Sequence, residues 1–183
     1  AGARVTPDPL RFNFTQFSPV TQADLDKIEA LVNEEILNNV PVTIEEMALD
    51  AAKEKGAMAL FGEKYGDVVR VVSVDDFSCE LCGGSHVANT SVIGSFRITS
   101  ETGTGSGVRR IEAVTGPAAL KLAKDESQEL QQLAGLLKAK VSDAPAKLEA
   151  LLAQLKDTEK ELAQLKKDAA LSDMDSILAA KED

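Results

Sequence analysis

Two hydrophobic periods organise the first part of the chain. Leu10, Phe12 and Phe14 alternate with polar residues, which is the period-two pattern of a half-buried strand over residues 10–17. Residues 22–38 instead carry apolar side chains at three- and four-residue steps, directly after a threonine with an aspartate three positions on. This combination predicts a capped, amphipathic helix.

Further strands and one short helix are expected downstream. A run of nearly unbroken valine predicts a strand at residues 68–74 that suits the middle of a sheet. Gly56 is a natural left-handed cap for a helix that begins near Asp50. The other expected strands are residues 41–45, 94–100 and 107–114, with a flexible hairpin tip at 101–106 between the last two. Residues 1–116 are therefore predicted to form an α+β domain with a mainly antiparallel sheet and packed helices.

A different pattern begins at Pro117. Leucines recur at three- and four-residue steps in residues 118–141 and 146–171, and residues 142–145 supply a turn, an N-cap and a first-turn proline. Facing leucine stripes with a short connection predict an antiparallel α-helical coiled-coil hairpin over residues 117–171, roughly 35 Å long. Residues 172–183 are expected to be a loop or the start of another helix, leading to a further domain.

Composition limits the classes of function. The net charge of −10 argues against a surface that binds nucleic acid by non-specific phosphate neutralisation. No apolar run approaches the ~20 residues that span a bilayer, and no signal segment opens the chain, so we expect a cytoplasmic protein without a membrane partner. Because the chain opens on Ala1 without methionine and stops without a helix terminator, we expect it to be a piece of a longer protein.

Both cysteines and the single histidine lie within residues 79–86. Cys82 and His86 are separated by Gly83 and Gly84, which are poor helix formers, so the pair is expected on a tight loop. A thiolate and an imidazole are ligands that zinc accepts, but two ligands make only half of a tetrahedral site. The alternative is a buried, inert thiol near a hydrogen-bonded histidine. A thioredoxin-like pair with Cys79 is disfavoured because two glycines follow it in place of a helix.

The glycines of the expected hairpin tip offer a second candidate. Gly103 and Gly105 do not form a dinucleotide fingerprint, because a strand follows them. Their backbone amides can approach a phosphate or a terminal ribose, and the alternative is a plain hairpin loop.

Several segments resemble alanyl-tRNA synthetase. The most specific reads Glu-Leu-Cys-Gly-Gly-Ser-His-Val at residues 80–87, and it is joined by Gly-Val-Arg-Arg-Ile-Glu-Ala-Val-Thr-Gly at 107–116. Shorter matches lie at residues 7–14, 57–66 and 93–96. The resemblance covers residues 4–116, and residues 117–171 fall where the family places the link to a C-terminal domain.

The resemblance implies an editing domain that hydrolyses mischarged Ser-tRNA(Ala) and Gly-tRNA(Ala). In the family, zinc is held by a His-x3-His pair on an earlier helix and by a Cys-x3-His pair, which Cys82 and His86 match as metal ligands and catalytic candidates. Ser85 stands where the family usually has threonine, and Cys79 lies outside the ligand pattern. ATP and Mg²⁺ belong to an aminoacylation domain outside this chain. The isolated chain is accordingly expected to bind zinc weakly and to deacylate poorly.

The expected partners are tRNA(Ala), the rest of the synthetase chain and a second copy, bound through the helical arm or through a C-terminal domain outside this chain. Candidates for the pocket and the tRNA end are polar residues of the first and last strands, namely Arg11, Asn13, Gln16, Arg109 and Arg110. Two other functions fit the sequence. One is a free-standing trans-editing deacylase; the other is an interaction module with a structural metal loop and a coiled coil that recruits a partner.

Overall fold

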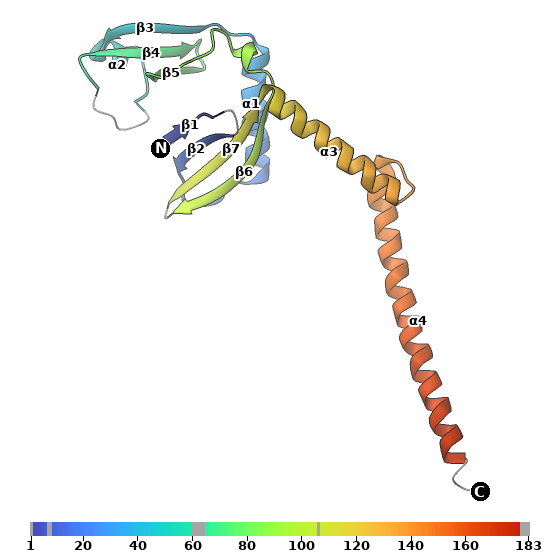
Figure 1. Ribbon diagram of the computed structural model, residues 1–183. Coiled ribbons are helices and arrows are strands. Elements are labelled where there is room, and N and C mark those ends of the chain that lie inside the picture. Colours follow the sequence, from blue (N-terminus) through green and yellow to red (C-terminus); the bar gives the residue numbers. More distant parts are fainter. Residues whose placement is uncertain (1, 7–8, 60–64, 106, 180–183) are drawn as a thin grey trace. The chain divides into compact units, whose positions relative to one another are not determined.

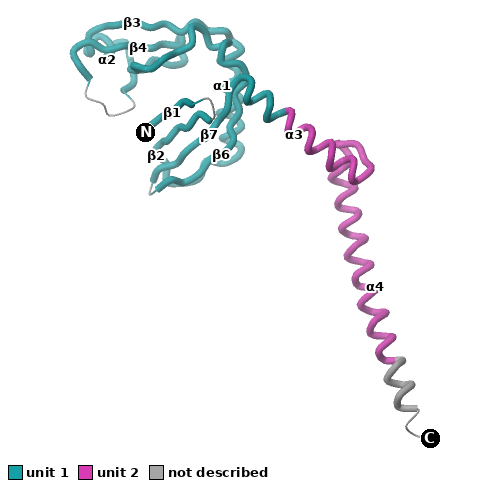
Figure 2. The backbone as a smooth tube through the Cα atoms, viewed as in Figure 1, with its two compact units in different colours: residues 1–123 teal, residues 124–183 magenta. Residues whose placement is uncertain are grey.

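The computed structural model describes residues 2–6, 9–59, 65–105 and 107–179. It contains two compact units, residues 1–123 and residues 124–183 (Figure 2). The first unit is α+β with antiparallel strand pairing, as the sequence predicts, but its described strands form two sheets where one was expected. Within the described ranges, no helix has the length and apolar character needed to cross a bilayer.

A four-stranded antiparallel sheet has the order β1-β2-β7-β6 (Figure 1). Its strands are β1 (Gly2–Arg4), β2 (Leu10–Thr15), β6 (Phe96–Gly105) and β7 (Val108–Thr115). The predicted flexible tip is wrong for residues 101–105, because β6 continues through them. Glu101 pairs with Ile111 and Gly103 pairs with Arg109, so the backbone there is held by β7. Residue 106 of the predicted tip lies outside the described residues, as do residues 7–8 of the first matched segment.

Helix α1 (Gln22–Leu37) packs on one face of this sheet. Its predicted cap is confirmed, since the Thr21 hydroxyl accepts the Asp24 N–H at 3.2 Å and donates to the Asp24 carboxylate at 2.8 Å. The core between helix and sheet is apolar; its members are Ile36, Phe96 and Ala113, flanked by Leu10, Val32, Ile93 and Ile98. Burial of this face stabilises the helix more than propensity does.

A three-stranded antiparallel sheet has the order β3-β4-β5. It is built from β3 (Val42–Ala48), β4 (Val68–Val74) and β5 (Ser78–Leu81), with α2 (Leu49–Glu54) against it. The valine strand β4 lies in the middle, as its composition predicts, and Gly56 ends the helical segment at φ 86°. The second core is made by Ala52, Val69, Val71 and Leu81. Residues 60–64 of the matched segment 57–66 lie outside the described residues.

Helix α3 (Gly116–Leu136) begins directly after β7. It ends five residues before the predicted boundary, because Lys138 adopts a left-handed φ of 51° and the Leu137–Ala139 amides bond back to the last turn. A short 3₁₀ turn, η2 (Val141–Asp143), leads to α4 (Ala144–Ala179), with Pro145 in its first turn as predicted. The expectation of a loop or a new helix from residue 172 is wrong as far as Ala179, because α4 continues; residues 180–183 lie outside the description.

Up to residue 171, where the structure describes the side chains of the arm, the predicted leucine stripes do not form a buried seam. Leu130 and Leu133 of α3 are 52% and 56% exposed, and Leu155 and Leu165 of α4 are 55% and 66% exposed. The structure thus provides the helices of the arm, and their pairing as a coiled coil stays a prediction.

Candidate functional site

The Cys82–His86 segment is a loop, as the two glycines predict. It follows β5, and the Cys82 N–H donates to the Arg70 carbonyl of β4 at 3.1 Å, which extends the β4–β5 ladder by one bond. Beyond His86, the Ala88 carbonyl accepts the Val42 N–H of β3 at 3.0 Å. The loop is therefore attached to the same sheet at both ends.

The side chain of Arg70 also binds the first half of this loop. Its Nη1 donates to the carbonyls of Cys82 and Gly84, both at 2.7 Å. Gly84 lies close to the thiol, since a Cβ at this position would stand 3.5 Å from the Cys82 Sγ. Sequence reasoning missed Arg70, and the available signal was a single charged residue inside a valine-rich strand.

His86 has an altered affinity for protons. Partial desolvation of this exposed side chain and the neighbouring charge of Arg70 lower the pKa of His86, while Glu80 opposes this effect. A lowered pKa favours the neutral imidazole, which is the form that binds metal.

The donor set of the loop suits zinc but does not complete a site. Cys82 is half-buried and His86 is exposed, so a sulfur and a nitrogen donor stand on one short segment. Among the residues that the structure describes, no group of three or more His, Cys, Asp or Glu side chains could hold a metal ion. Within the described residues, the loop therefore offers two candidate donors, and a tetrahedral zinc site needs two more.

Cys79 belongs to the fold rather than to the loop. It packs against the core of the three-stranded sheet and receives a hydrogen bond from the Ser73 hydroxyl at 3.4 Å. Both cysteines are free thiols. This placement agrees with leaving Cys79 out of the ligand set.

The polar candidates of the four-stranded sheet fall on two faces. Register places Arg11 opposite Glu112 and Asn13 opposite Arg110. The Arg11 Nε donates to the Glu112 carboxylate at 2.8 Å, and the Arg110 Nε donates to the Asn13 amide oxygen at 2.9 Å. These four side chains share the face opposite α1. The sheet therefore brings together Arg11, Asn13 and Arg110, three of the residues predicted to contact the substrate or the tRNA end.

Arg109 lies on the other face, where it forms an ion pair with Glu101. Their side chains are only 14% and 6% exposed, and the Arg109 Nη2 donates to the Glu101 carboxylate at 2.6 Å. This hydrogen bond lowers the pKa of Glu101, with a further contribution from a backbone bond to Val20, against the opposing effect of burial. Arg109 therefore lies on the opposite face from Arg110, with its guanidinium bound to Glu101, and its contact with tRNA stays a prediction.

The remaining predicted contacts lie near the β6–β7 turn. The Gln16 N–H donates to the Gly107 carbonyl at 3.0 Å, and its side-chain amide reaches Ser18. Gly103 and Gly105 are paired with Arg109 and Val108 within the hairpin. Their backbone is thus part of the sheet instead of a free phosphate loop.

Comparisons with known proteins identify the region. Residues 69–112 match the family model of the "Threonyl and Alanyl tRNA synthetase second additional domain". The chain is 50% identical over 98% of its length to an alanine–tRNA ligase of Acetivibrio thermocellus, and 53% identical over 100% to one of Desulfitobacterium hafniense. Over almost its whole length, the chain matches a segment of alanyl-tRNA synthetases. It covers 20% and 21% of these two relatives, and the resemblance predicted from the sequence is confirmed.

The segment matched to the synthetase domain contains the loop and its support. Arg70, Cys82 and His86 all lie within residues 69–112, as do both arginines of β7. The alanyl-tRNA synthetase region is thus the one that carries the candidate chemistry.

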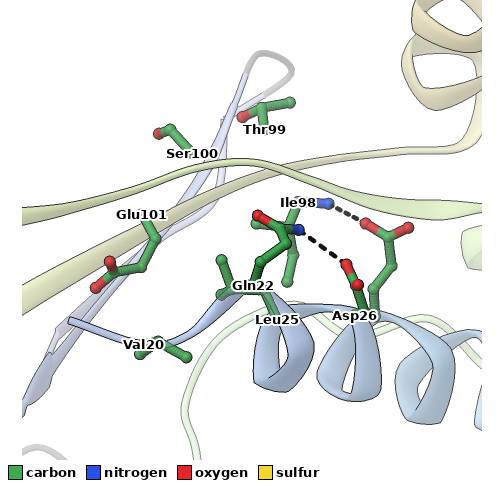
Figure 3. Close-up of a pocket in the computed structure, with 9 residues that line it drawn as sticks. Val20, Gln22, Leu25, Asp26, Ile98, Thr99, Ser100 and Glu101 are labelled. Carbon is green, nitrogen blue, oxygen red and sulfur yellow. Dashed lines mark hydrogen bonds between the residues drawn. The ribbon is translucent and has the colours of Figure 1, made fainter.

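A polar pocket of about 290 Å³ lies elsewhere in the first unit, between the start of α1 and β6 (Figure 3). The Glu29 carboxylate accepts the Ile98 N–H at 2.7 Å and the Asp26 carboxylate accepts the Gln22 amide at 2.8 Å, so these acidic groups already have donors. The pocket contains neither Cys82 nor His86 among its lining residues. We therefore assign the chemistry to the loop.

Proposed function

We propose that this chain supplies half of a zinc-dependent editing site in an alanyl-tRNA synthetase, and that the site hydrolyses mischarged Ser-tRNA(Ala) and Gly-tRNA(Ala). The observation that carries the proposal is the loop of Cys82 and His86, attached at both ends to one sheet within the region that matches the synthetase domain. The chain spans about a fifth of the relatives, so the two further metal donors have a natural source in the rest of such a protein.

The proposed role of each residue follows from its chemistry. Cys82 would bind as a thiolate and His86 as a neutral imidazole, which its lowered pKa favours. Zinc, when bound, supplies a positive charge that polarises an ester or a water. Because an aminoacyl ester is already activated, the protein has mainly to orient it and to distinguish its side chain.

Recognition of the substrate is proposed for the polar face of the four-stranded sheet. Arg11, Asn13 and Arg110 lie there together and have donors suited to phosphate or ribose oxygens. A site that hydrogen-bonds the serine hydroxyl discriminates strongly against alanine, which lacks it.

The whole protein, on this proposal, is a cytoplasmic enzyme that attaches alanine to tRNA(Ala) with ATP and Mg²⁺ bound in a separate domain. We also propose that α3 and α4 form a coiled-coil arm. Its support is the leucine spacing and the exposure of those leucines, which leaves an apolar stripe for the facing helix or for a second copy.

A zinc titration of this chain at neutral pH tests the half-site. Two donors should give weak binding that Cys82→Ser removes, whereas Cys79→Ser, the matched control, should leave it unchanged. Sub-nanomolar one-to-one binding by the monomer would contradict the half-site.

The two other functions make different predictions. A free-standing trans-editing deacylase requires this chain alone to deacylate Ser-tRNA(Ala) efficiently, while our proposal expects poor activity. An interaction module requires that deletion of residues 117–171 abolish function and that Cys82→Ser leave it intact.

A further inference from the structure

The side chain of Arg70 connects the central strand of the three-stranded sheet with the loop of residues Cys82–His86, called the metal loop below. It stands in β4 between Val69 and Val71, both of which are buried in the core of that sheet. Its own side chain is directed to the other face of the sheet, and its paired residue in β3 is Glu46. A charged side chain in such a strand needs hydrogen-bond acceptors nearby, because the free-energy cost of a buried donor without an acceptor exceeds the stability that a typical hydrogen bond contributes.

The donors of Arg70 are satisfied by the loop backbone. One nitrogen, Nη1, carries two N–H groups and donates to the carbonyls of Cys82 and Gly84 at 2.7 Å each. The Arg70 carbonyl in turn accepts the Cys82 N–H at 3.1 Å. A single residue thus fixes the peptide groups on both sides of the Gly83 position.

The loop needs this external support because its own sequence is permissive. Gly83 and Gly84 have large backbone freedom, and a Cβ at Gly83 would meet nothing within 4 Å. Without a restraint, the direction of the Cys82 thiol relative to the His86 imidazole would vary. The second attachment, the Val42 N–H to the Ala88 carbonyl, lies beyond His86 and does not restrain the glycines.

We propose that Arg70 is a positioning residue for the metal half-site: its guanidinium, bound to the carbonyls of Cys82 and Gly84, fixes the turn that presents the thiolate and the imidazole together. This inference rests on the proposed function. Arg70 does not touch the metal in this scheme, and it acts through the loop backbone. Charge-assisted bonds of an arginine to carbonyls are short and directional, which suits a role in orientation.

The first arm of the test needs no metal. Arg70→Gln should raise the hydrogen-exchange rate of the Cys82 amide, which is bonded to the Arg70 carbonyl, at least tenfold, with little change in β3, and should move the NMR signals of His86, the only histidine of the chain. Arg70→Lys has one nitrogen that can still reach the carbonyls, so it should restore part of the protection. Arg4→Gln, on the exposed strand β1, is the matched control and should leave the loop unchanged.

The second arm measures metal affinity in an alanyl-tRNA synthetase that carries this segment. Residues that orient metal ligands typically change affinity by about 10- to 100-fold when replaced. Arg70→Gln should therefore weaken zinc retention against a chelator about tenfold, and Arg70→Lys by less. Unchanged loop exchange and unchanged zinc retention in Arg70→Gln would overturn the proposal.

Failure of the proposed function has a different signature. If Cys82→Ser leaves zinc retention of the synthetase unchanged, the half-site itself is wrong, and the role of Arg70 toward a metal is overturned with it, whatever the exchange data show. If Cys82→Ser abolishes retention while Arg70→Gln does not alter it, only the role of Arg70 is wrong.

Discussion

Gly94 and Gly116 approach each other so closely that a Cβ built on Gly94 would lie 3.1 Å from the Gly116 Cα. Gly94 ends the 3₁₀ turn η1 (Thr90–Ile93) at φ 73° and ψ −145°, and Gly116 begins α3 at φ 54°. The Gly116 N–H donates to the Ser95 carbonyl at 2.8 Å, which locks the two segments together. Two of the segments that resemble the synthetase family thus meet here, and both need glycine.

Gly94→Ala should destabilise the first unit by about 1–3 kcal/mol, because the backbone conformation is nearly restricted to glycine and the new methyl group meets backbone atoms. Gly135→Ala in α3 is the control, since a Cβ there meets nothing within 4 Å and alanine favours a helix. Thermal denaturation of both variants measures the difference. Equal stability of the two variants would contradict the close approach.

Asn33→Ala should cost about 2 kcal/mol and loosen β6 from α1. The Asn33 side chain donates to the Phe96 carbonyl at 2.8 Å and accepts the Phe96 N–H at 2.9 Å, so its removal leaves two part-buried backbone groups without these partners. Hydrogen exchange of the first residues of β6 reports the change, and Gln128→Ala, on the exposed surface of α3, is the control. Unchanged exchange near Phe96 would show that the contact contributes little.

Glu101 makes the first unit sensitive to acid. Its hydrogen bond with Arg109 lowers its pKa below the usual 4.5, so the folded state binds a proton less readily than the unfolded state. The stabilisation is complete above about pH 4.5, where both states are ionised, and is lost as the pH falls through the lower pKa of the folded state.

Denaturation with urea at several pH values measures this effect. Wild type should exceed Glu101→Gln in stability at neutral pH, and the difference should shrink below about pH 4.5. Glu149→Gln, at an exposed position of α4, should show no comparable pH-dependent difference. A difference between wild type and Glu101→Gln that does not vary with pH would rule out the ionised pair as its cause.

The elements with strong local signals were predictable from the sequence. Period-two alternation marked β2, a capping threonine and three- and four-residue steps marked α1, and unbroken valine marked β4. The loop character of Cys82–His86 followed from Gly83 and Gly84. In each case the local pattern and the tertiary packing favour the same conformation.

The errors occur where tertiary pairing decides. Glycine and threonine at residues 101–105 are typical of a turn, yet β7 holds them as strand through cross-strand pairs that no local pattern reveals. The side chain of Arg70 contacts carbonyls 12 and 14 residues away in the sequence. Its position in a run of valines therefore predicted a strand but not these contacts. The placement of Arg109 and Arg110 on opposite faces was predictable from the sequence, because successive side chains of a strand alternate between the two faces of a sheet.

The clearance of Ser-tRNA(Ala) by an alanyl-tRNA synthetase that contains this segment tests the central claim most directly. Single-turnover deacylation should be lost in His86→Ala, because the metal loop would lose its nitrogen donor, and retained in Cys79→Ser, whose thiol packs in the core. Deacylation by His86→Ala at the wild-type rate would contradict the account and remove this histidine from the site.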